Sequence, residues 1–232
     1  MDRLGALGAE YHDPVAEIDW DAAAPDLKWL TPGTLCLAAL EGGADASSED
    51  LIRFSRAEFA RLCAAGLWLE GLLISRLTAR GFPAARADEA RVMLQEVREE
   101  SGHGLMFLEM IDRAGFTGVR LLGPTRLLTW VAHRLAPDSA EFWAMVYVGE
   151  TVTDTLAVLA LREAADGSPI CPVARQVLTL HHRDEARHIA AARSFLKARV
   201  ADMGWLRRRL FSGFFRFLLR RFLWATLYPT EA

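Results

Sequence analysis

Residues 181–188 read His-His-Arg-Asp-Glu-Ala-Arg-His, and residues 100–103 read Glu-Ser-Gly-His. Each segment contains one Glu-x-x-His motif, a spacing that places a carboxylate and an imidazole on adjacent turns of one helical face. Apolar residues recur at spacings of three and four around both motifs, so each motif faces the predicted core. One such motif is a weak signal, but two copies on two long helices indicate a shared site.

Two more carboxylates interrupt apolar stripes. Glu70 shares a helical face with Cys63 and Leu67, and Glu150 shares one with Val146. A lone buried carboxylate is unfavourable unless it is neutralised or paired, so the same exception on two helices indicates a common partner. The alternative is that either glutamate lines a tunnel or belongs to a surface face that is out of phase.

Together the four helices carry the ligands of a dinuclear, carboxylate-bridged iron or manganese site. Two divalent cations would neutralise four carboxylates that otherwise repel one another in a dry core. Oxygen and imidazole ligands suit iron, or manganese, better than calcium or structural zinc. The candidate metal ligands, which are also the candidate catalytic residues, are Glu70, Glu100, His103, Glu150, His181, Glu185 and His188.

His181 adds a third imidazole to this set. It lies four residues before Glu185 and therefore on the same face, whereas His182 is rotated by about 100°. A third imidazole would make one metal richer in nitrogen than its partner. The alternative is a core histidine that is hydrogen-bonded to a carbonyl group.

Other polar residues are candidates for supporting roles. A metal-bound histidine usually donates its second N–H to a carboxylate, and Glu99, Asp154 and Asp184 are placed to accept it. For Glu99 and Asp184 the alternative is a solvated helix face. Three side chains are candidates for holding an acid group of a substrate, and the sequence favours none of them over the others: Arg98, Tyr147 and Arg187.

Helical periodicity predicts an all-α fold without strands. The predicted helices span 47–80, 87–114, 125–135, 138–165, 173–203 and 205–228, and four of them have the length of bundle helices. Ser47 with Asp50 resembles a capping box, and Gly81-Phe82-Pro83 and Gly115 are stop signals. We expect a single domain with three parts: an irregular arm (1–47), a helical bundle (48–203) and a basic helix with a tail (204–232).

Composition narrows the class of protein. The 232 residues carry a formal net charge of −3, and 52% are hydrophobic, which favours one folded domain over disorder. The near-neutral charge gives no global field for nucleic acid. Cys36, Cys63 and Cys171 lie far apart, which argues against a disulfide framework or a zinc ribbon. Residues 1–10 lack a signal-peptide pattern and no uncharged apolar run approaches about 18 residues, so the predicted location is the cytoplasm.

The C-terminal segment is a basic amphipathic helix. Residues 204–232 contain six arginines and one acid, and the arginines alternate with leucine and phenylalanine at near-helical spacing. Such a helix docks on the acidic remainder of the chain, covers the active site, forms a dimer contact, or lies on an anionic membrane surface through 204–228. Nucleic-acid binding is the least favoured reading.

The order of the candidate ligands resembles that of the diiron arylamine N-oxygenases, typified by p-aminobenzoate N-oxygenase. The extra His181 is the specific part of the resemblance, because ordinary ferritin-like sites lack it. The arm residues 13–21 and the Asp-Glu-Ala-Arg-His run at 184–188 are also similar to that family. The resemblance covers roughly residues 11 to 203, and it departs from the family at Gly102, beside a ligand, and in the shorter chain.

The resemblance implies a ferritin-like fold, two iron ions and a homodimer. It also implies an oxidoreductase, a monooxygenase that activates O₂ to a peroxo-level diferric oxidant and oxidises the nitrogen of a small amine. Electrons would come from an external donor, because the sequence has no GxGxxG motif for a flavin or nicotinamide. The rival interpretations are an iron-storage or ferroxidase bundle, a diiron hydroxylase or peroxidase, and a metal-free helical interaction module.

Overall fold

The computed structural model describes residues 12–35, 47–79, 87–115 and 124–227. These parts contain α-helices and two short 3-10 helices, and no strand. The all-α prediction is therefore confirmed. The elements in chain order are α1 (Pro14–Glu17), η1 (Trp20–Ala22), η2 (Pro32–Thr34), α2 (Ser48–Thr78), α3 (Ala87–Ala114), α4 (Pro124–Ala132), α5 (Ala140–Ala165), α6 (Pro172–Ala201) and α7 (Trp205–Leu227).

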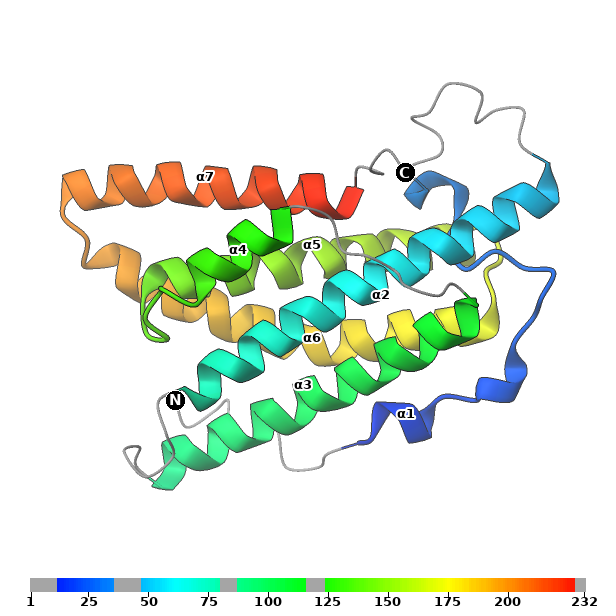
Figure 1. Cartoon of the computed structure of the whole chain (residues 1–232), viewed down its shortest axis with the longest axis horizontal. Helices are drawn as coiled ribbons and strands as arrows, with labels where there is room; N and C mark the ends of the chain where they lie inside the picture. The colour runs from blue at the N-terminus through cyan, green and yellow to red at the C-terminus, as the bar shows by residue number, and fades with distance from the viewer. Residues whose placement is uncertain (1–11, 36–46, 80–86, 116–123, 228–232) are drawn as a thin grey trace.

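Four long helices form the bundle, in a ferritin-like arrangement. α2 packs along α3, and α5 packs along α6 (Figure 1). α7 lies along α5 and also contacts α4 and α2, while α1 rests on α3. The predicted bundle therefore gains a fifth long helix on its outside.

Local signals set the helix ends. The Ser47 hydroxyl accepts a hydrogen bond from the Asp50 N–H, and the Ser139 hydroxyl accepts one from the Phe142 N–H, so serines cap α2 and α5. Gly115 follows α3 with φ of 74°, and Gly167 follows α5 with φ of 105°, conformations that suit glycine.

Two helices end earlier than the sequence predicts. α4 stops at Ala132 rather than 135, and α6 stops at Ala201 rather than 203. In both cases the chain tightens into a final turn, because Leu135 N–H donates to Ala132 C=O and Met203 N–H donates to Val200 C=O.

A polar layer separates two hydrophobic clusters inside the bundle. On α6, residues up to Leu180 belong to one cluster, and residues from Ala192 onward belong to the other. The buried polar residues of α6 lie between these two positions. Each long helix of the bundle thus supplies apolar packing around a short central segment that is polar and buried.

The described part of the N-terminal arm packs against one end of the bundle. Trp29 and Leu30 are buried in the cluster that includes the first turns of α6. The backbone N–H of Cys171 donates to Lys28 C=O at 2.7 Å, which ties the arm to the start of α6. The predicted stop at Gly81–Pro83, Cys36 and the chain beyond Leu227 lie outside the described residues.

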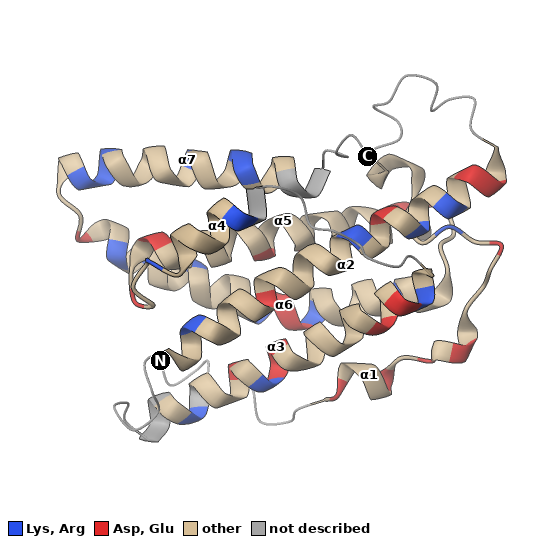
Figure 2. Cartoon of the chain, in the orientation of Figure 1, with Lys and Arg blue, Asp and Glu red and all other residues tan. Residues whose placement is uncertain are grey.

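α5 is, in the described part of the chain, the one helix long and apolar enough to cross a membrane by length and composition. Half of its most apolar window is buried inside the bundle, so α5 has the features of a core helix. α7 is different: its charged residues are all basic (Figure 2), and Leu218 and Phe222 anchor its second half on the bundle. Its first turns expose Trp205, Leu206 and Leu210.

Candidate metal centre

The polar layer brings together the seven predicted ligands. They come from all four bundle helices: one glutamate each from α2 and α5, one Glu-x-x-His motif each from α3 and α6, and His181 one turn earlier on α6. None of the seven is more than 6% exposed. The set is Glu70, Glu100, His103, Glu150, His181, Glu185 and His188.

The two Glu-x-x-His motifs interlock. His103 Nδ1 lies 3.3 Å from both Glu100 Oε2, in its own motif, and Glu185 Oε1, in the other. His188 Nδ1 lies 3.3 Å from Glu185 Oε2 and 3.2 Å from Glu100 Oε1. Each of these two glutamates therefore contacts both imidazoles, an arrangement suited to carboxylates that bridge two metal ions.

The remaining side chains divide between the two ends of this core. Glu70 Oε1 lies 3.8 Å from His181 Nε2, and His181 Nε2 lies 3.4 Å from Glu185 Oε1. Ligand atoms of Glu70, His103, His181 and Glu185 fall within 4.8 Å of one another. Glu150 interacts electrostatically with Glu185, Glu100 and His188. The group that includes His181 thus contains two imidazoles.

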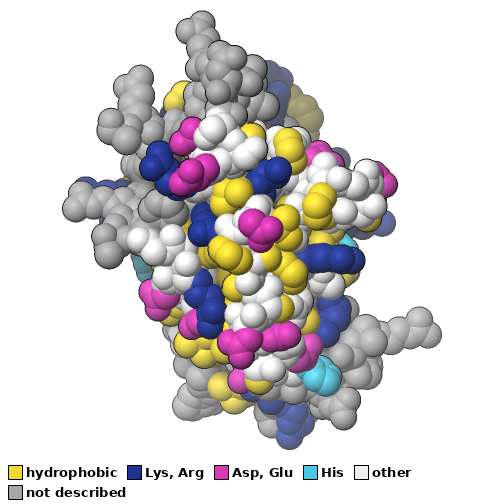
Figure 3. All heavy atoms as spheres, turned by 90° about the vertical axis from the view of Figure 1, so that its right-hand side faces the viewer, with side chains coloured by type: hydrophobic (Ala, Val, Ile, Leu, Met, Phe, Trp, Pro, Cys, Tyr) yellow, Lys and Arg dark blue, Asp and Glu magenta, His cyan; other side chains and the backbone are white. Residues whose placement is uncertain are grey.

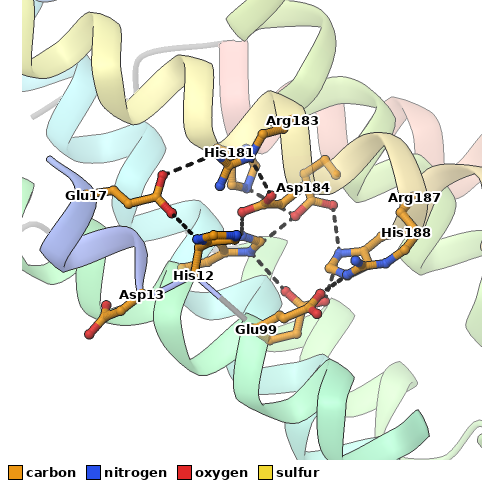
Figure 4. Close-up of polar contacts among 12 residues, drawn as sticks. His12, Asp13, Glu17, Glu99, His181, Arg183, Asp184, Arg187 and His188 are labelled. Carbon is orange, nitrogen blue, oxygen red and sulfur yellow. Dashed lines mark hydrogen bonds and ion pairs between the residues drawn. The ribbon is translucent and has the colours of Figure 1, made fainter. Parts of the chain in front are cut away.

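Carboxylates also contact the second ring nitrogen, Nε2, of His103 and His188. His103 Nε2 lies 3.5 Å from Asp184 Oδ2, and His188 Nε2 lies 3.3 Å from Glu99 Oε2 (Figure 4). His188 Nε2 is also 3.0 Å from Glu96 Oε2. Such contacts fix the ring orientation and direct Nδ1 toward the centre of the site.

Glu96 was not identified from the sequence. It lies four residues before Glu100 and so on the same face of α3, a spacing that could have revealed it. Glu96 Oε2, Glu100 and His188 form a second group of potential ligand atoms within 4.8 Å. Although burial opposes it, hydrogen bonding to His188 lowers the pKa of Glu96, so this carboxylate is negatively charged at neutral pH.

Asp154, the third candidate to accept an N–H from a metal-bound histidine, contacts a histidine outside the predicted ligand set. Its Oδ1 atom is 2.5 Å from His182 Nδ1, and His182 points away from the site because it is rotated from His181 on the helix. Asp154 therefore orients an imidazole outside the predicted ligand set. By contrast, Asp184 is connected to the arm: Arg183 donates to Asp184 at 3.0 Å and to Glu17 at 3.2 Å (Figure 4).

The donor set fits metal ions because nine of its buried atoms make no hydrogen bond. In the described part of the chain, twelve buried side-chain nitrogen and oxygen atoms have no hydrogen-bond partner, and nine belong to this site. Buried polar atoms are nearly always satisfied, so nine orphans in one place indicate a missing cationic partner. The orphaned atoms lie on Glu70, Glu100, Glu150, His181, Glu185 and His188.

The pKa values also indicate that a cationic partner is missing from these buried carboxylates. Burial, followed by repulsion from Glu100 and Glu185, raises the pKa of Glu70 and Glu150 well above the ordinary range. Glu185 is also buried, yet the surrounding imidazoles hold its pKa well below that range. Burial opposes a charge on His103, but hydrogen bonds to Asp184 and Glu100 raise its pKa to about 9. The metal-free site thus retains protons where metal ions would supply positive charge.

An apolar cavity of about 50 Å³ borders one side of the site. Glu70, Glu150 and His181 form its polar floor. Three of its lining leucines are half-buried, Leu62 on α2, Leu156 on α5 and Leu178 on α6, and we call this more exposed side the mouth of the cavity. These helices meet the arm at the end of the bundle seen in Figure 3, where hydrophobic side chains lie between charged ones.

Comparisons with known proteins agree with this geometry. Uncharacterized proteins of Mycobacterium bovis and Mycobacterium tuberculosis are each 29% identical to the chain over 230 residues, which is 95% of this chain. The chain spans 66% of the length of these curated relatives. No solved structure matches it. Residues 5–232 match the family described as p-aminobenzoate N-oxygenase AurF, and the chain belongs to that family.

Proposed function

We propose that this protein is an O₂-dependent diiron oxygenase that oxidises the nitrogen of a small amine, most simply an arylamine. One observation carries the proposal: four carboxylates and three imidazoles from four helices converge in a dry core with nine atoms unpartnered. The family match supports an oxygenase rather than another metal protein. The mycobacterial relatives add no assigned activity.

Seven side chains would hold the two metal ions. Glu70, His103 and His181 would hold one ion and Glu150 and His188 the other, while Glu100 and Glu185, which each contact both motif histidines, would contribute to both. Two iron ions bound there would supply the reduction of O₂. Iron is favoured over manganese because of the family, and either suits oxygen and imidazole ligands.

The chain's own residues perform the remaining work. The outer carboxylates of Asp184 and Glu99 hold the two imidazoles in position. Glu70 and Glu150, whose pKa values are raised, hold protons that they release when cations bind. The apolar residues around the site exclude bulk water, which limits side reactions.

The proposed reaction is balanced with an external reductant. An amine R–NH₂, O₂, two electrons and two protons give a hydroxylamine R–NHOH and water. One oxygen atom forms a new bond to nitrogen, and the other leaves as water. An external electron donor is therefore a required partner.

We also propose that the active form of the protein is a homodimer in the cytoplasm.

Anaerobic loading with Fe²⁺, followed by O₂ in the presence of an arylamine and a chemical reductant, tests this function. We expect two irons per chain by metal analysis and a product 16 mass units heavier than the amine, which corresponds to one added oxygen. The Glu150→Gln variant is the control, because its protein should stay helical and lose product. Ferric mineral in a large cage, without amine oxidation, would instead identify an iron-storage protein.

We also propose a peripheral membrane contact for the start of α7. Trp205 is 74% exposed, and Leu206 and Leu210 are 60% and 68% exposed, beside a run of arginines at 207–209. Tryptophan and leucine next to basic residues suit the interface of an anionic membrane. Co-sedimentation with phosphatidylglycerol vesicles should fall in the Trp205→Ala/Leu206→Ala variant. Binding that is unchanged, or absent in both proteins, would contradict this contact.

A further inference from the structure

The cavity beside the metal centre contains no positively charged residue in the described part of the chain. Its walls are aliphatic or aromatic, as in Leu30, Phe59 and Val177. Its charged or titratable groups are Glu70, Glu150 and His181, which belong to the proposed ligand set, and the Cys63 thiol. A substrate that enters here meets an apolar surface and then the ligands themselves.

The two other polar groups on the wall offer no recognition of an anion. The Thr153 hydroxyl donates within its own helix, to the carbonyl groups of Gly149 and Glu150, both at 3.1 Å. Burial raises the pKa of the Cys63 thiol well above its ordinary value, so this group is a neutral thiol. Neither side chain can compensate a negative charge.

The residues considered from the sequence as holders of an acidic group lie away from the cavity. Arg187 forms an ion pair with Glu99, on the opposite side of His188. The ring of Tyr147 packs against Phe215 of α7, with ring centroids 6.5 Å apart. Arg98 is exposed on α3 and does not line the cavity. An acid group on the substrate would therefore meet no cation among the described residues that line the cavity.

We infer that the substrate is an amine with an apolar, uncharged body, and that an arylamine bearing a carboxylate, such as p-aminobenzoate, is disfavoured. The inference rests on the proposed function and narrows its substrate. A carboxylate in an apolar cavity is unfavourable without a cation or several hydrogen bonds, and the described residues that line this cavity provide neither. An arylamine nitrogen is neutral at pH 7 because its lone pair is delocalised into the ring, so it enters without that penalty.

The size of the cavity fixes the orientation. Its volume is about 50 Å³, about a third of the roughly 150 Å³ of a protein cavity that holds a benzene ring. This room fits an amino group and O₂, while a ring needs more. The amino end therefore points to Glu70 and His181 on the floor, and the ring lies among Leu62, Leu156 and Leu178 at the mouth.

Equilibrium dialysis on the iron-loaded protein under anaerobic conditions tests the inference without turnover. The probes are p-toluidine and p-aminobenzoate, which differ in a methyl group against a carboxylate at the same ring position. We expect p-toluidine to bind at least about tenfold more tightly. A dissociation constant for p-aminobenzoate equal to or below that of p-toluidine would overturn the inference, as would no binding of p-toluidine at millimolar concentration.

A charge placed at the mouth should change the preference. In Leu178→Arg we expect the affinity for p-aminobenzoate to rise by about tenfold, because a guanidinium can pair with the carboxylate. Leu178→Gln controls for side-chain size and polarity. Leu159→Arg adds the same charge at an exposed site on α5 that does not line the cavity, and it should leave both affinities unchanged. An equal rise in Leu159→Arg would show that the carboxylate binds elsewhere.

The outcomes separate this inference from the proposed function. Two irons per chain with amine oxidation, but tighter binding of p-aminobenzoate, would remove the substrate assignment and leave the oxygenase. A clear preference for p-toluidine without any O₂-dependent product would leave the apolar binding site and remove the oxygenase.

Discussion

His188 Nδ1, on α6, lies 3.2 Å from Glu100 Oε1, on α3, so the imidazole of one Glu-x-x-His motif faces the carboxylate of the other. The reciprocal contact joins His103 and Glu185 at 3.3 Å. Neither motif forms the site by itself, because the two oxygens of each glutamate contact two different histidines, one from each motif. The pair of helices therefore acts as one unit, and a change at Glu100 or Glu185 should affect both of the proposed metal positions.

Replacing Glu100 by glutamine should abolish loading of both metal ions. The variant removes one of the four negative charges that balance two divalent cations and leaves an amide next to two imidazoles. We expect iron per chain, measured by metal analysis after anaerobic loading, to fall from two to well below one. The far-ultraviolet circular dichroism should stay helical.

Glu109→Gln is the matched control for that change. Glu109 also lies on α3, but it pairs with Arg113 on the surface and is far from the ligand set. Its iron content should equal that of the unmodified protein. Two irons retained by Glu100→Gln would contradict the assignment of a bridging carboxylate.

Much of the fold was predictable because its helices carry local signals. Ser47 and Ser139 cap helices through their own hydroxyl groups, and Gly115 ends α3 through its positive φ, all of which depend on neighbours in the sequence. The inward direction of Glu70 followed from spacing alone. The frayed end of α4 did not, because the last turn is decided by i to i−3 hydrogen bonds of similar energy.

Contacts between helices were harder to predict. Asp154 and Asp184 are similar residues near predicted ligands, but Asp154 meets His182 while Asp184 meets His103. The distinction depends on how far α5 and α6 are rotated about their axes, which a single sequence does not state. The absence of a cation among the described residues that line the cavity likewise required the relative placement of the arm and the bundle helices.

The outer carboxylate of Asp184 should tune metal affinity. In Asp184→Asn the contact with His103 Nε2 loses its negative charge, so the imidazole is a weaker and less oriented ligand. We expect the anaerobic affinity for Fe²⁺ to fall by about 10- to 100-fold, measured by competition with a chelator. Asp154→Asn is the control, since that side chain meets His182, and its affinity should not change. Equal losses in the two variants would indicate a nonspecific effect of charge.

The metal-free protein should lose stability as the pH rises from about 6.5 to about 9. The pKa of His103 is raised to about 9 from an ordinary 6.5, and that of His188 is raised as well. A histidine of this kind stabilises the fold fully below pH 6.5, and the contribution is lost as the pH passes the folded-state pKa. Glu70 and Glu150 act in the same direction, because they too bind protons more tightly when folded.

Metal should reverse this trend, because cations displace those protons. The increase in melting temperature on adding Mn²⁺, which avoids oxidation, is expected to grow with pH over the same interval. Differential scanning fluorimetry with EDTA or with Mn²⁺ measures both curves. A metal-free melting temperature that rises between pH 6.5 and 9 would contradict the assignment of protons to these buried histidines and glutamates.

The close approach of α2 to α3 should make Gly66 intolerant of a side chain. A Cβ atom at this position would lie 2.6 Å from the ring of Phe107, which is buried and packs against His181 with ring centroids 5.1 Å apart and the ring planes tilted by 57°. We expect Gly66→Ala to destabilise the protein by about 1–2 kcal/mol, since overpacking outweighs the gain in helix propensity. Gly71→Ala, on the same helix with nothing within 4 Å of the new atom, should instead stabilise it by up to about 1 kcal/mol. Chemical denaturation of both variants measures the difference, and a stabilised Gly66→Ala would mean that Phe107 moves freely and that the wall of the cavity is not rigid.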